Sequence, residues 1–282
     1  MKERISITLD SQLVGQLDGM VDGKEIKNRS HAIELLLSKA LKLDVPRKAV
    51  LLAGGKGTRL RPLTYEIPKG LIPVQGKTLT EHLFDLFKRY GITNIVLSIG
   101  HMGDKIKQHF GNGEKFGVQI TYAEETQPLG TAGPLRLCKR LLQESFIVSN
   151  GDELKDINIP EMYKFHKQNN ALATIALTTV SDPSAYGVAR LSGNRILEFV
   201  EKPAVEKAPS KLINSGFYIL EPAVLELIPE GFAMLETAVF PKLAKQGKLF
   251  GYPFSGQWFD TGTLERYERA IKEWRGISKN GD

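Results

Sequence analysis

The sequence has 282 residues, of which 41% are hydrophobic and 25% charged, and its formal net charge is +6 at pH 7. This composition is typical of a globular protein with one sizeable domain and a smaller unit, and no apolar run is long enough for a membrane span. The single cysteine, Cys138, excludes an intrachain disulfide and a cysteine-based metal cluster, and the N-terminus lacks a secretory signal pattern, so we expect a cytoplasmic protein.

Residues 1–43 predict a small unit made of one strand and two helices. From Ile5 to Leu9, apolar and polar residues alternate, as in a strand with one apolar face. Asp10 or Ser11 is suited to cap a first helix, and Ser30 is suited to cap a second one. This order of elements, with Asn-Arg-Ser-His-Ala-Ile opening the second helix, resembles the ribbon-helix-helix domain.

A unit of this size cannot bury a core of its own, so we expect a homodimer or higher homo-oligomer that forms through residues 1–43. The resemblance implies that the outward residues of the ribbon enter the major groove of DNA, and that the start of the second helix holds a phosphate. The corresponding residues are Arg4, Ser6, Thr8 and Arg29. Two interpretations stay open, DNA binding or dimerisation alone, because only Arg4 in the ribbon is a strong reader of bases.

A short linker over residues 44–48 leads into a larger region, residues 48–275, in which apolar runs alternate with helical patterns. The predicted strands include 49–53, 95–99, 118–123, 146–149 and 173–179, and the predicted helices include 79–90 and 135–142. This alternation predicts an α/β domain with a doubly wound, mostly parallel sheet. Ligands in such sheets bind beyond the carboxyl ends of the strands.

The stretch 51–64 combines glycines and cations directly after the first predicted strand of this domain. Glycines let the backbone approach an anion because no Cβ intervenes, so the loop is suited to phosphate. Positive charge comes from Lys56, Arg59 and Arg61. The spacing is not that of a P-loop, and a dinucleotide-binding fingerprint would need a third glycine where Leu60 stands.

The pattern Gly-Gly-x-Gly-Thr-Arg-Leu-x-Pro-Leu-Thr, followed by Pro-Lys at 68–69, resembles the signature of the sugar-1-phosphate nucleotidyltransferases, also called nucleotide-sugar pyrophosphorylases. The resemblance covers nearly all of the chain from residue 48 to 270. It implies the Rossmann-like fold of that family and two catalytic cations, Arg59 and Lys69. It also implies that two loops bind the nucleotide. Their residues are Leu52, Ala53, Gly54, Gly55, Gly57 and Thr58 in the first loop, and Gly130 and Thr131 in the second.

Further residues match the rest of the family pattern. The resemblance implies that Asp152, which follows the apolar run 146–149, and Asp260, in Trp-Phe-Asp-Thr-Gly, hold Mg²⁺. Glu153 departs from the pattern, because the family often has asparagine or an apolar residue there. Sugar-phosphate binding is implied for Gly187, Glu201, Lys202 and Asn214. Each motif alone would fit an ordinary turn or a solvated ion pair, whereas their common order indicates one active site.

The resemblance implies transfer of a nucleoside monophosphate from a nucleoside triphosphate to a sugar 1-phosphate, with release of pyrophosphate. A phosphate monoester is already nucleophilic at neutral pH, so no histidine or cysteine base is expected. The segments 125–133, 165–166 and 234–236 look most like mannose-1-phosphate or heptose-1-phosphate guanylyltransferases, which use GTP. Glucose-1-phosphate thymidylyl- or uridylyltransferases are the alternative within the family.

A regulator that binds DNA and uses the transferase domain as a nucleotide-sugar sensor is the alternative of another class. Loss of a catalytic residue would favour this alternative. The residues that match the catalytic and phosphate-binding positions are all present, namely Arg59, Lys69, Asp152, Lys202 and Asp260. The sequence therefore favours the enzyme, and the two functions are compatible in one chain.

Overall fold

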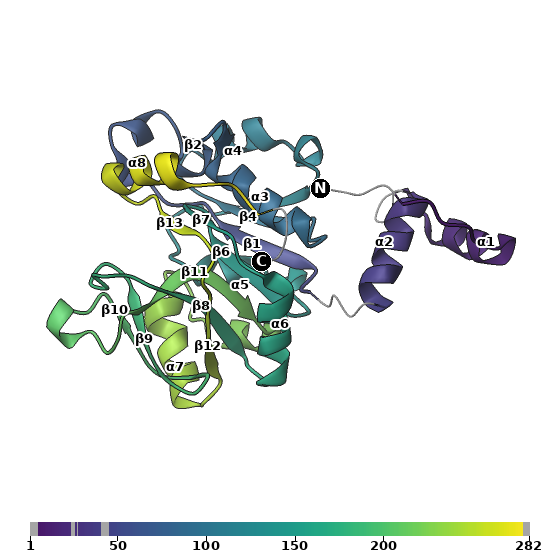
Figure 1. Cartoon of the computed structure of the whole chain (residues 1–282). Helices are drawn as coiled ribbons and strands as arrows, with labels where there is room; N and C mark the ends of the chain where they lie inside the picture. The colour runs from purple at the N-terminus through teal and green to yellow at the C-terminus, as the bar shows by residue number, and fades with distance from the viewer. Residues whose placement is uncertain (1–4, 24–25, 27, 41–44, 279–282) are drawn as a thin grey trace. The chain divides into compact units, whose positions relative to one another are not determined.

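The structure is a computed structural model that describes residues 5–23, 26, 28–40 and 45–278. The chain divides into two compact units, Met1–Val45 and Pro46–Asp282. Figure 1 shows the helices of the first unit and the sheet with its surrounding helices in the second. None of the helices that the structure describes is long and apolar enough to cross a membrane.

The first unit contains two helices, α1 (Ser11–Met20) and α2 (Arg29–Ala40). The Asp10 side chain accepts a hydrogen bond of 2.9 Å from the Leu13 amide, so Asp10 caps α1, which is one of the two predicted caps. The predicted cap of the second helix is wrong. The helix begins one residue before Ser30, at Arg29. Asn28, the residue that precedes the helix, is the cap, since its side chain accepts a hydrogen bond of 2.9 Å from the His31 amide.

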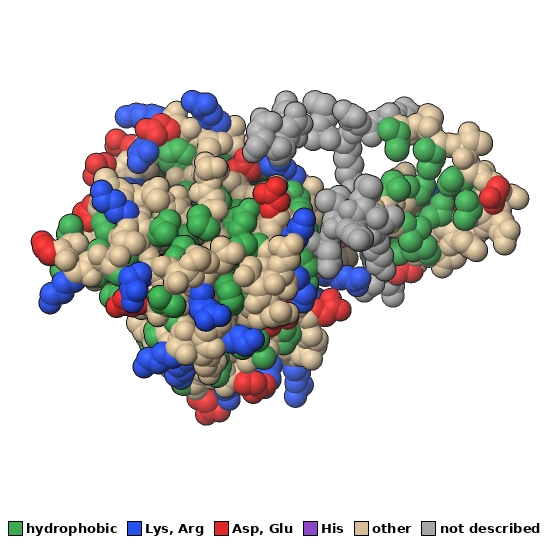
Figure 2. All heavy atoms as spheres, turned by 60° about the horizontal axis from the view of Figure 1, so that its bottom comes forward, with side chains coloured by type: hydrophobic (Ala, Val, Ile, Leu, Met, Phe, Trp, Pro, Cys, Tyr) green, Lys and Arg blue, Asp and Glu red, His purple; other side chains and the backbone are tan. Residues whose placement is uncertain are grey.

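The predicted strand over residues 5–9 is not formed in the single chain, where this segment has no regular secondary structure. A lone strand has no neighbour to satisfy its backbone amides and carbonyls, which explains the difference. Ile5, Ile7 and Leu9 are 67%, 52% and 37% exposed. Figure 2 shows hydrophobic side chains over much of the visible face of this unit.

The residues of this unit that the ribbon-helix-helix resemblance assigned to DNA have different surroundings. Arg4 lies outside the described residues, whereas Ser6 and Thr8 are exposed. Arg29 forms a bidentate ion pair with Asp18, at 2.5 Å from Nε and 2.7 Å from Nη2, and this pair joins α2 to α1. The Arg29 guanidinium therefore has a partner within the chain.

The second unit is built on a nine-stranded sheet with the order β5-β4-β1-β6-β11-β8-β12-β10-β9. Its strands are β1 (Lys48–Leu52), β4 (Asn94–Ile99), β5 (Gln119–Glu124), β6 (Phe146–Asn150), β8 (Ala173–Thr179), β9 (Gly187–Ser192), β10 (Arg195–Glu201), β11 (Leu212–Leu220) and β12 (Leu249–Pro253). The five strands predicted from apolar runs correspond to β1, β4, β5, β6 and β8, with ends that agree within one residue.

The prediction of a mostly parallel sheet is correct only for the first half of the domain. Strands β5, β4, β1 and β6 pair in parallel, as does β12 with β8. In contrast, β11 runs antiparallel to both β6 and β8, and β10 is antiparallel to β9 and β12. Two residues suffice to connect β9 to β10, and so short a connection permits only an antiparallel pair.

Helices surround this sheet (Figure 1). They are α3 (Leu79–Arg89), α4 (Gly103–Phe110), α5 (Gly133–Leu137), α6 (Ile159–Gln168), α7 (Phe240–Lys245) and α8 (Leu264–Glu273). The predicted helix 79–90 is α3, where Thr78 and Glu81 form a capping box. The predicted helix 135–142 is split into α5 and a 3₁₀ turn, Lys139–Leu141. A large core joins sheet residues such as Val50 and Tyr218 to α5 and α7.

Two short antiparallel ribbons lie outside the main sheet, and the second of them carries residues of the predicted site. One pairs β2 (Pro73–Val74) with β3 (Lys77–Thr78). The other pairs β7 (Glu153–Lys155) with β13 (Trp258–Asp260), and its register sets Asp260 opposite Glu153. The second ribbon brings together segments that lie about a hundred residues apart in the chain, and so it determines the position of both predicted metal ligands.

Candidate active site

The glycine loop begins where β1 ends, and its residue Gly57 lies close to the side chain of Lys69. Gly57 has a φ of +61°, and a Cβ there would lie 2.8 Å from Thr64 Cγ2 and 3.3 Å from Lys69 Cβ. The Thr64 hydroxyl donates a hydrogen bond of 2.8 Å to the Gly57 carbonyl. Glycine is needed at this position, since any side chain would be strained and would push against the stem of the lysine. The other predicted loop residues lie at the end of β1 and in the turn that follows it.

The two predicted catalytic cations lie in the same part of the structure as the two predicted metal ligands. Lys69 is mostly buried, and its Nζ lies 2.5 Å from Asp152 Oδ2. A Cβ added at Gly262 would lie 2.7 Å from Asp260 Oδ1 and 3.1 Å from Arg59 Nη2, so the Arg59 guanidinium reaches the turn after Asp260. The structure therefore gathers four residues from four separate segments into one charged cluster.

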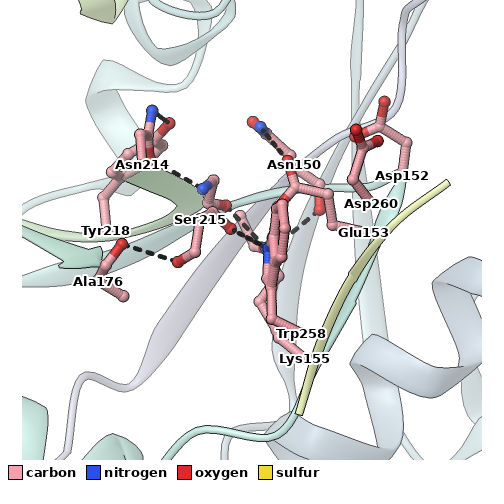
Figure 3. Close-up of polar contacts among 12 residues, drawn as sticks. Asn150, Asp152, Glu153, Lys155, Ala176, Asn214, Ser215, Tyr218, Trp258 and Asp260 are labelled. Atoms are coloured by element: carbon pink, nitrogen blue, oxygen red, sulfur yellow. Dashed lines mark hydrogen bonds and ion pairs between the residues drawn. The ribbon is translucent and has the colours of Figure 1, made fainter. Parts of the chain in front are cut away.

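The β7–β13 ribbon sets Asp260 opposite Glu153, the residue after Asp152, and Figure 3 shows the side chains of Asp152 and Asp260 near each other. The Thr261 hydroxyl also donates a hydrogen bond of 2.8 Å to the backbone carbonyl of Asp152. Burial disfavours the charged form of Asp152, but the ammonium groups of Lys69 and Lys155 outweigh burial and hold the pKa of its carboxyl below the usual value. Asp152 is therefore a carboxylate at neutral pH.

The donor set of this cluster fits Mg²⁺ that is shared with a substrate. Mg²⁺ prefers oxygen ligands and is often held by one or two carboxylates together with phosphates and water. Asp152 and Asp260 supply two carboxylates. Among the residues that the structure describes, no group of three or more acidic, histidine or cysteine side chains is arranged for a metal. The protein thus offers part of a coordination shell, and phosphates would complete it.

Glu153, the residue that departs from the family pattern, is mostly buried in a polar network next to this cluster (Figure 3). Its carboxylate accepts hydrogen bonds from Asn150 at 3.0 Å, Trp258 Nε1 at 3.0 Å and Lys155 at 3.2 Å. Burial raises the pKa of Glu153, although Lys155 opposes this shift. Because these three donors occupy its carboxylate, we interpret Glu153 as a residue that stabilises the β7–β13 ribbon and not as a further metal ligand.

Lys155 is a buried cation that sequence reasoning missed. It is 1% exposed, and its Nζ donates to the backbone carbonyls of Ser215 at 2.8 Å and Gly216 at 3.0 Å. Burial lowers the pKa of Lys155, although Glu153 opposes this shift. The available signal was that residues two apart in a strand share a face, so Glu153 and Lys155 point to the same side.

The predicted sugar residues lie on β9, β10 and β11, except Lys202, which directly follows β10. Glu201 Oε2 is buried and has no hydrogen-bond partner among the described residues, and a Cβ at Gly187 would lie 2.8 Å from it. Lys202 is 61% exposed, with Nζ 3.3 Å from Glu201 Oε1. Asn214 is more occupied, since it accepts from the Gly216 amide at 2.9 Å and donates to the Tyr218 hydroxyl at 2.8 Å. Glu201 thus offers an acceptor for a ligand hydroxyl.

The second predicted nucleotide loop, with Gly130 and Thr131, is hydrogen-bonded to the segment 235–236, a contact that the sequence did not predict. The Thr131 hydroxyl donates to Glu236 Oε2 at 2.5 Å and accepts from the Leu235 amide at 2.8 Å. The Tyr218 hydroxyl donates to Glu236 Oε1 at 3.3 Å. Burial raises the pKa of Glu236. The Thr131 side chain therefore holds the loop in place against the segment 233–236.

Residues 48–275 match the family described as Nucleotidyl transferase. The chain belongs to the nucleotidyl transferase family. It is 40% identical over 221 residues to mannose-1-phosphate guanyltransferase beta-B of Xenopus laevis, a match that covers 76% of this chain and 61% of that one. It is also 38% identical over 242 residues to the UTP–glucose-1-phosphate uridylyltransferase of Synechocystis, covering 80% of this chain and 62% of that one.

Among solved structures, HddC from Yersinia pseudotuberculosis, complexed with GMP-PN, is similar to this nucleotidyl transferase. The TM-score is 0.69 at 26% identity, over 81% of this chain and all of that one. The match to the curated relatives is less complete, because this chain spans about 61% of the length of the Xenopus enzyme.

Proposed function

We propose that this protein transfers a nucleoside monophosphate from a nucleoside triphosphate to a sugar 1-phosphate and releases pyrophosphate. The observation that carries the proposal is the charged cluster, in which Lys69 pairs with Asp152, the residue before the partner of Asp260 in the β7–β13 ribbon, and the Arg59 guanidinium lies at the turn after Asp260. A reaction between two anions needs positive charge more than it needs a general base. Membership of the nucleotidyl transferase family supports the same reaction class.

The reaction is an in-line displacement at the α-phosphorus. A phosphate oxygen of the sugar 1-phosphate forms the new bond, the bond to the bridging oxygen of the β-phosphate breaks, and pyrophosphate leaves with that electron pair. Arg59 and Lys69 stabilise the charge on the α-phosphate and on pyrophosphate. Mg²⁺ held by Asp152 and Asp260 would supply further positive charge at phosphate oxygens when bound.

GTP with mannose 1-phosphate or heptose 1-phosphate is our proposed substrate pair. Support comes from the name of the Xenopus relative and from the guanine nucleotide analogue in the HddC structure. Glucose 1-phosphate with a thymidine or uridine triphosphate is the alternative, supported by the name of the Synechocystis relative. We assign the sugar hydroxyls to Glu201, whose buried Oε2 lacks a partner among the described residues, and the sugar phosphate to Lys202.

A panel of four nucleoside triphosphates against several sugar 1-phosphates, read by pyrophosphate release with Mg²⁺, tests this proposal. We expect the largest kcat/KM for GTP with mannose or heptose 1-phosphate. Lys202→Ala should raise the KM for sugar phosphate far more than the KM for nucleotide, whereas the matched variant Lys207→Ala, of an exposed lysine nearby, should change neither. Absence of pyrophosphate release from every pair would overturn the reaction class.

For the first unit we propose a dimer formed through residues 1–43, in which strands 5–9 of two chains pair. The exposed, alternating Ile5, Ile7 and Leu9 support this assembly, because pairing would bury their common face. Ile7→Lys should therefore give monomers in sedimentation analysis, whereas Thr8→Lys, on the opposite face of the strand, should leave the dimer intact. A wild-type protein that is monomeric at micromolar concentration would contradict the proposal.

DNA binding by this unit is a separate proposal, which would add a regulatory function to the enzyme. Its support is the ribbon-helix-helix resemblance, with Arg4 as the reader of bases. Arg4→Ala should leave the dimer intact and weaken binding to a specific duplex by about 1–3 kcal/mol. If the intact protein prefers no duplex over random competitor at low salt, the unit is a dimerisation module only.

A further inference from the structure

Arg266, on α8, is placed directly against one of the two acidic residues of the site. Its Nη1 donates a hydrogen bond to Asp260 Oδ2, and its guanidinium lies over the Tyr186 ring at 5.1 Å from the centroid. The Tyr186 hydroxyl donates to the same Oδ2 at 3.1 Å. The Asp260 side chain is 12% exposed and that of Arg266 is 33% exposed, so this pair is only partly open to water.

Both acids of the site therefore have a positive partner from the chain itself. Asp152 pairs with Lys69 at 2.5 Å, and Asp260 pairs with Arg266. Two carboxylates held side by side repel each other, and nearby cations offset this repulsion. Lys69 matches a position of the family pattern, whereas the pattern assigns no part to Arg266. Arg266 needs its own explanation.

We propose that Arg266 is the resident counter-ion of Asp260 and competes with the divalent cation for this carboxylate, so that it weakens metal binding in the absence of substrates. The proposal rests on the proposed function in one respect, namely that Asp260 is a metal ligand. Oδ2 already accepts two hydrogen bonds and Oδ1 accepts one from the Gly262 amide at 2.6 Å. A metal ion that binds Oδ2 must displace one of its two donors, and a metal ion that binds Oδ1 takes the one acceptor site that remains, close to the guanidinium.

The charge-assisted bond from Arg266 is the strongest of the three, and the guanidinium also repels a metal cation that approaches the same carboxylate. Removal of the guanidinium should therefore strengthen metal binding, both because a competing hydrogen bond is lost and because a nearby positive charge is removed. A residue that merely orients Asp260 would have the opposite effect, because its loss would loosen the ligand and weaken metal binding. The sign of the change thus separates a competitor from a positioning residue.

The test is the binding of Mn²⁺ to the full-length protein without substrates, followed through the electron paramagnetic resonance signal of free Mn²⁺. Arg266→Met should bind Mn²⁺ about tenfold more tightly than the wild type, as expected for loss of a competing charged hydrogen bond. Tyr186→Phe keeps the ring but removes one neutral donor, so it should give a smaller increase, about threefold. Equal or weaker binding by Arg266→Met, including no detectable binding in either protein, would overturn the proposal.

Arg269→Met is the matched control, because it removes the same charge from the same helix. Arg269 is 69% exposed and pairs with Glu273, with no hydrogen bond to Asp260 among the described contacts. It should leave Mn²⁺ binding unchanged, and an equal increase in both variants would mean that net charge alone is responsible. Asp260→Asn should abolish the effect of Arg266→Met. Wild-type transferase activity with no effect of Arg266→Met on Mn²⁺ defeats only this inference, whereas a protein inactive with every substrate pair defeats the proposed function.

Discussion

The Thr261 hydroxyl donates a hydrogen bond of 2.8 Å to the backbone carbonyl of Asp152, and Thr261 itself is fully buried. This bond joins the segment after β6 to the segment after β13, and each segment carries one of the proposed metal ligands. The β7–β13 register sets Asp260 opposite Glu153. The hydrogen bond of Thr261 joins the next residue of one strand to Asp152, the preceding residue of the other. Two residues far apart in the sequence thus depend on one hydroxyl for their spacing.

Thr261→Val removes this hydroxyl and keeps the size of the side chain. We expect a loss of about 1–3 kcal/mol in the free energy of unfolding, because the Asp152 carbonyl is left without its donor. Turnover should also fall, since the spacing of the two acids relaxes. Urea unfolding and steady-state kinetics measure the two effects. Thr261→Ser retains the hydroxyl and should preserve activity, so an equally inactive serine variant would point to the methyl group instead.

Asp152→Asn and Asp260→Asn test the metal assignment. Each replacement removes a negative charge but keeps the size of the side chain, so turnover should fall by a factor on the order of 100 or more while the fold stays intact. Circular dichroism and pyrophosphate release provide the two readouts. Asp182→Asn, of an exposed acid in a loop, is the control and should be fully active. A double variant of Asp152 and Asp260 with near wild-type turnover would contradict the assignment.

Gly130 and Gly231 allow a matched test of the second nucleotide loop, because both have a φ of +78°. A Cβ at Gly130 would overlap the carbonyl oxygen of Ala233, whereas a Cβ at Gly231 would meet no atom within 4 Å. Gly231→Ala should cost about 1 kcal/mol of stability for the backbone conformation alone. Gly130→Ala should cost more and raise the KM for the nucleotide. Equal losses of stability would show that the loop moves away without penalty.

Trp274 tests the small hydrophobic cluster behind the charged site. It is 1% exposed and packs with Leu60, Ile72 and Leu154, which lie close in sequence to Arg59, Lys69 and Asp152. Trp274→Ala should cost about 3–5 kcal/mol of stability. Trp274→Phe removes mainly the hydrogen bond of 3.2 Å to His82 Nδ1, so the free energy of unfolding should fall by about 1 kcal/mol. Thermal unfolding compares the two variants, and an Ala variant as stable as the Phe variant would contradict the packing role.

Glu221 gives a prediction about stability and pH. The hydrogen bond with His166, together with those from Ser145 and Lys167, lowers the pKa of Glu221 to about 2. A depressed carboxyl pKa contributes stability that is fully present above the ordinary value of 4.5 and is lost as the pH falls toward 2. Glu221→Gln should thus be less stable than the wild type at pH 7, by up to about 3 kcal/mol. The difference should shrink at pH 2.5 to 3, and a difference that does not vary with pH would contradict this origin.

Local patterns in the sequence were sufficient for several features of this protein. The apolar run of β1 and the glycines that follow predicted the strand and the loop, because hydrophobic periodicity and glycine determine backbone conformation within a few residues. The order of the motifs predicted the family, which the match over residues 48–275 confirmed. The parallel half of the sheet followed from alternating strands and helices, since a parallel connection needs a crossover.

Tertiary structure alone decided which distant segments meet. The antiparallel β11, the Thr131–Glu236 contact and the Arg266–Asp260 pair join residues through packing and register, which no local period encodes. The N-terminal segment 5–9 shows that a clear local pattern can also be insufficient to form an element. Its alternation is clear in the sequence, yet residues 5–9 stay irregular in a single chain, because a strand becomes stable only when a neighbour satisfies its backbone hydrogen bonds.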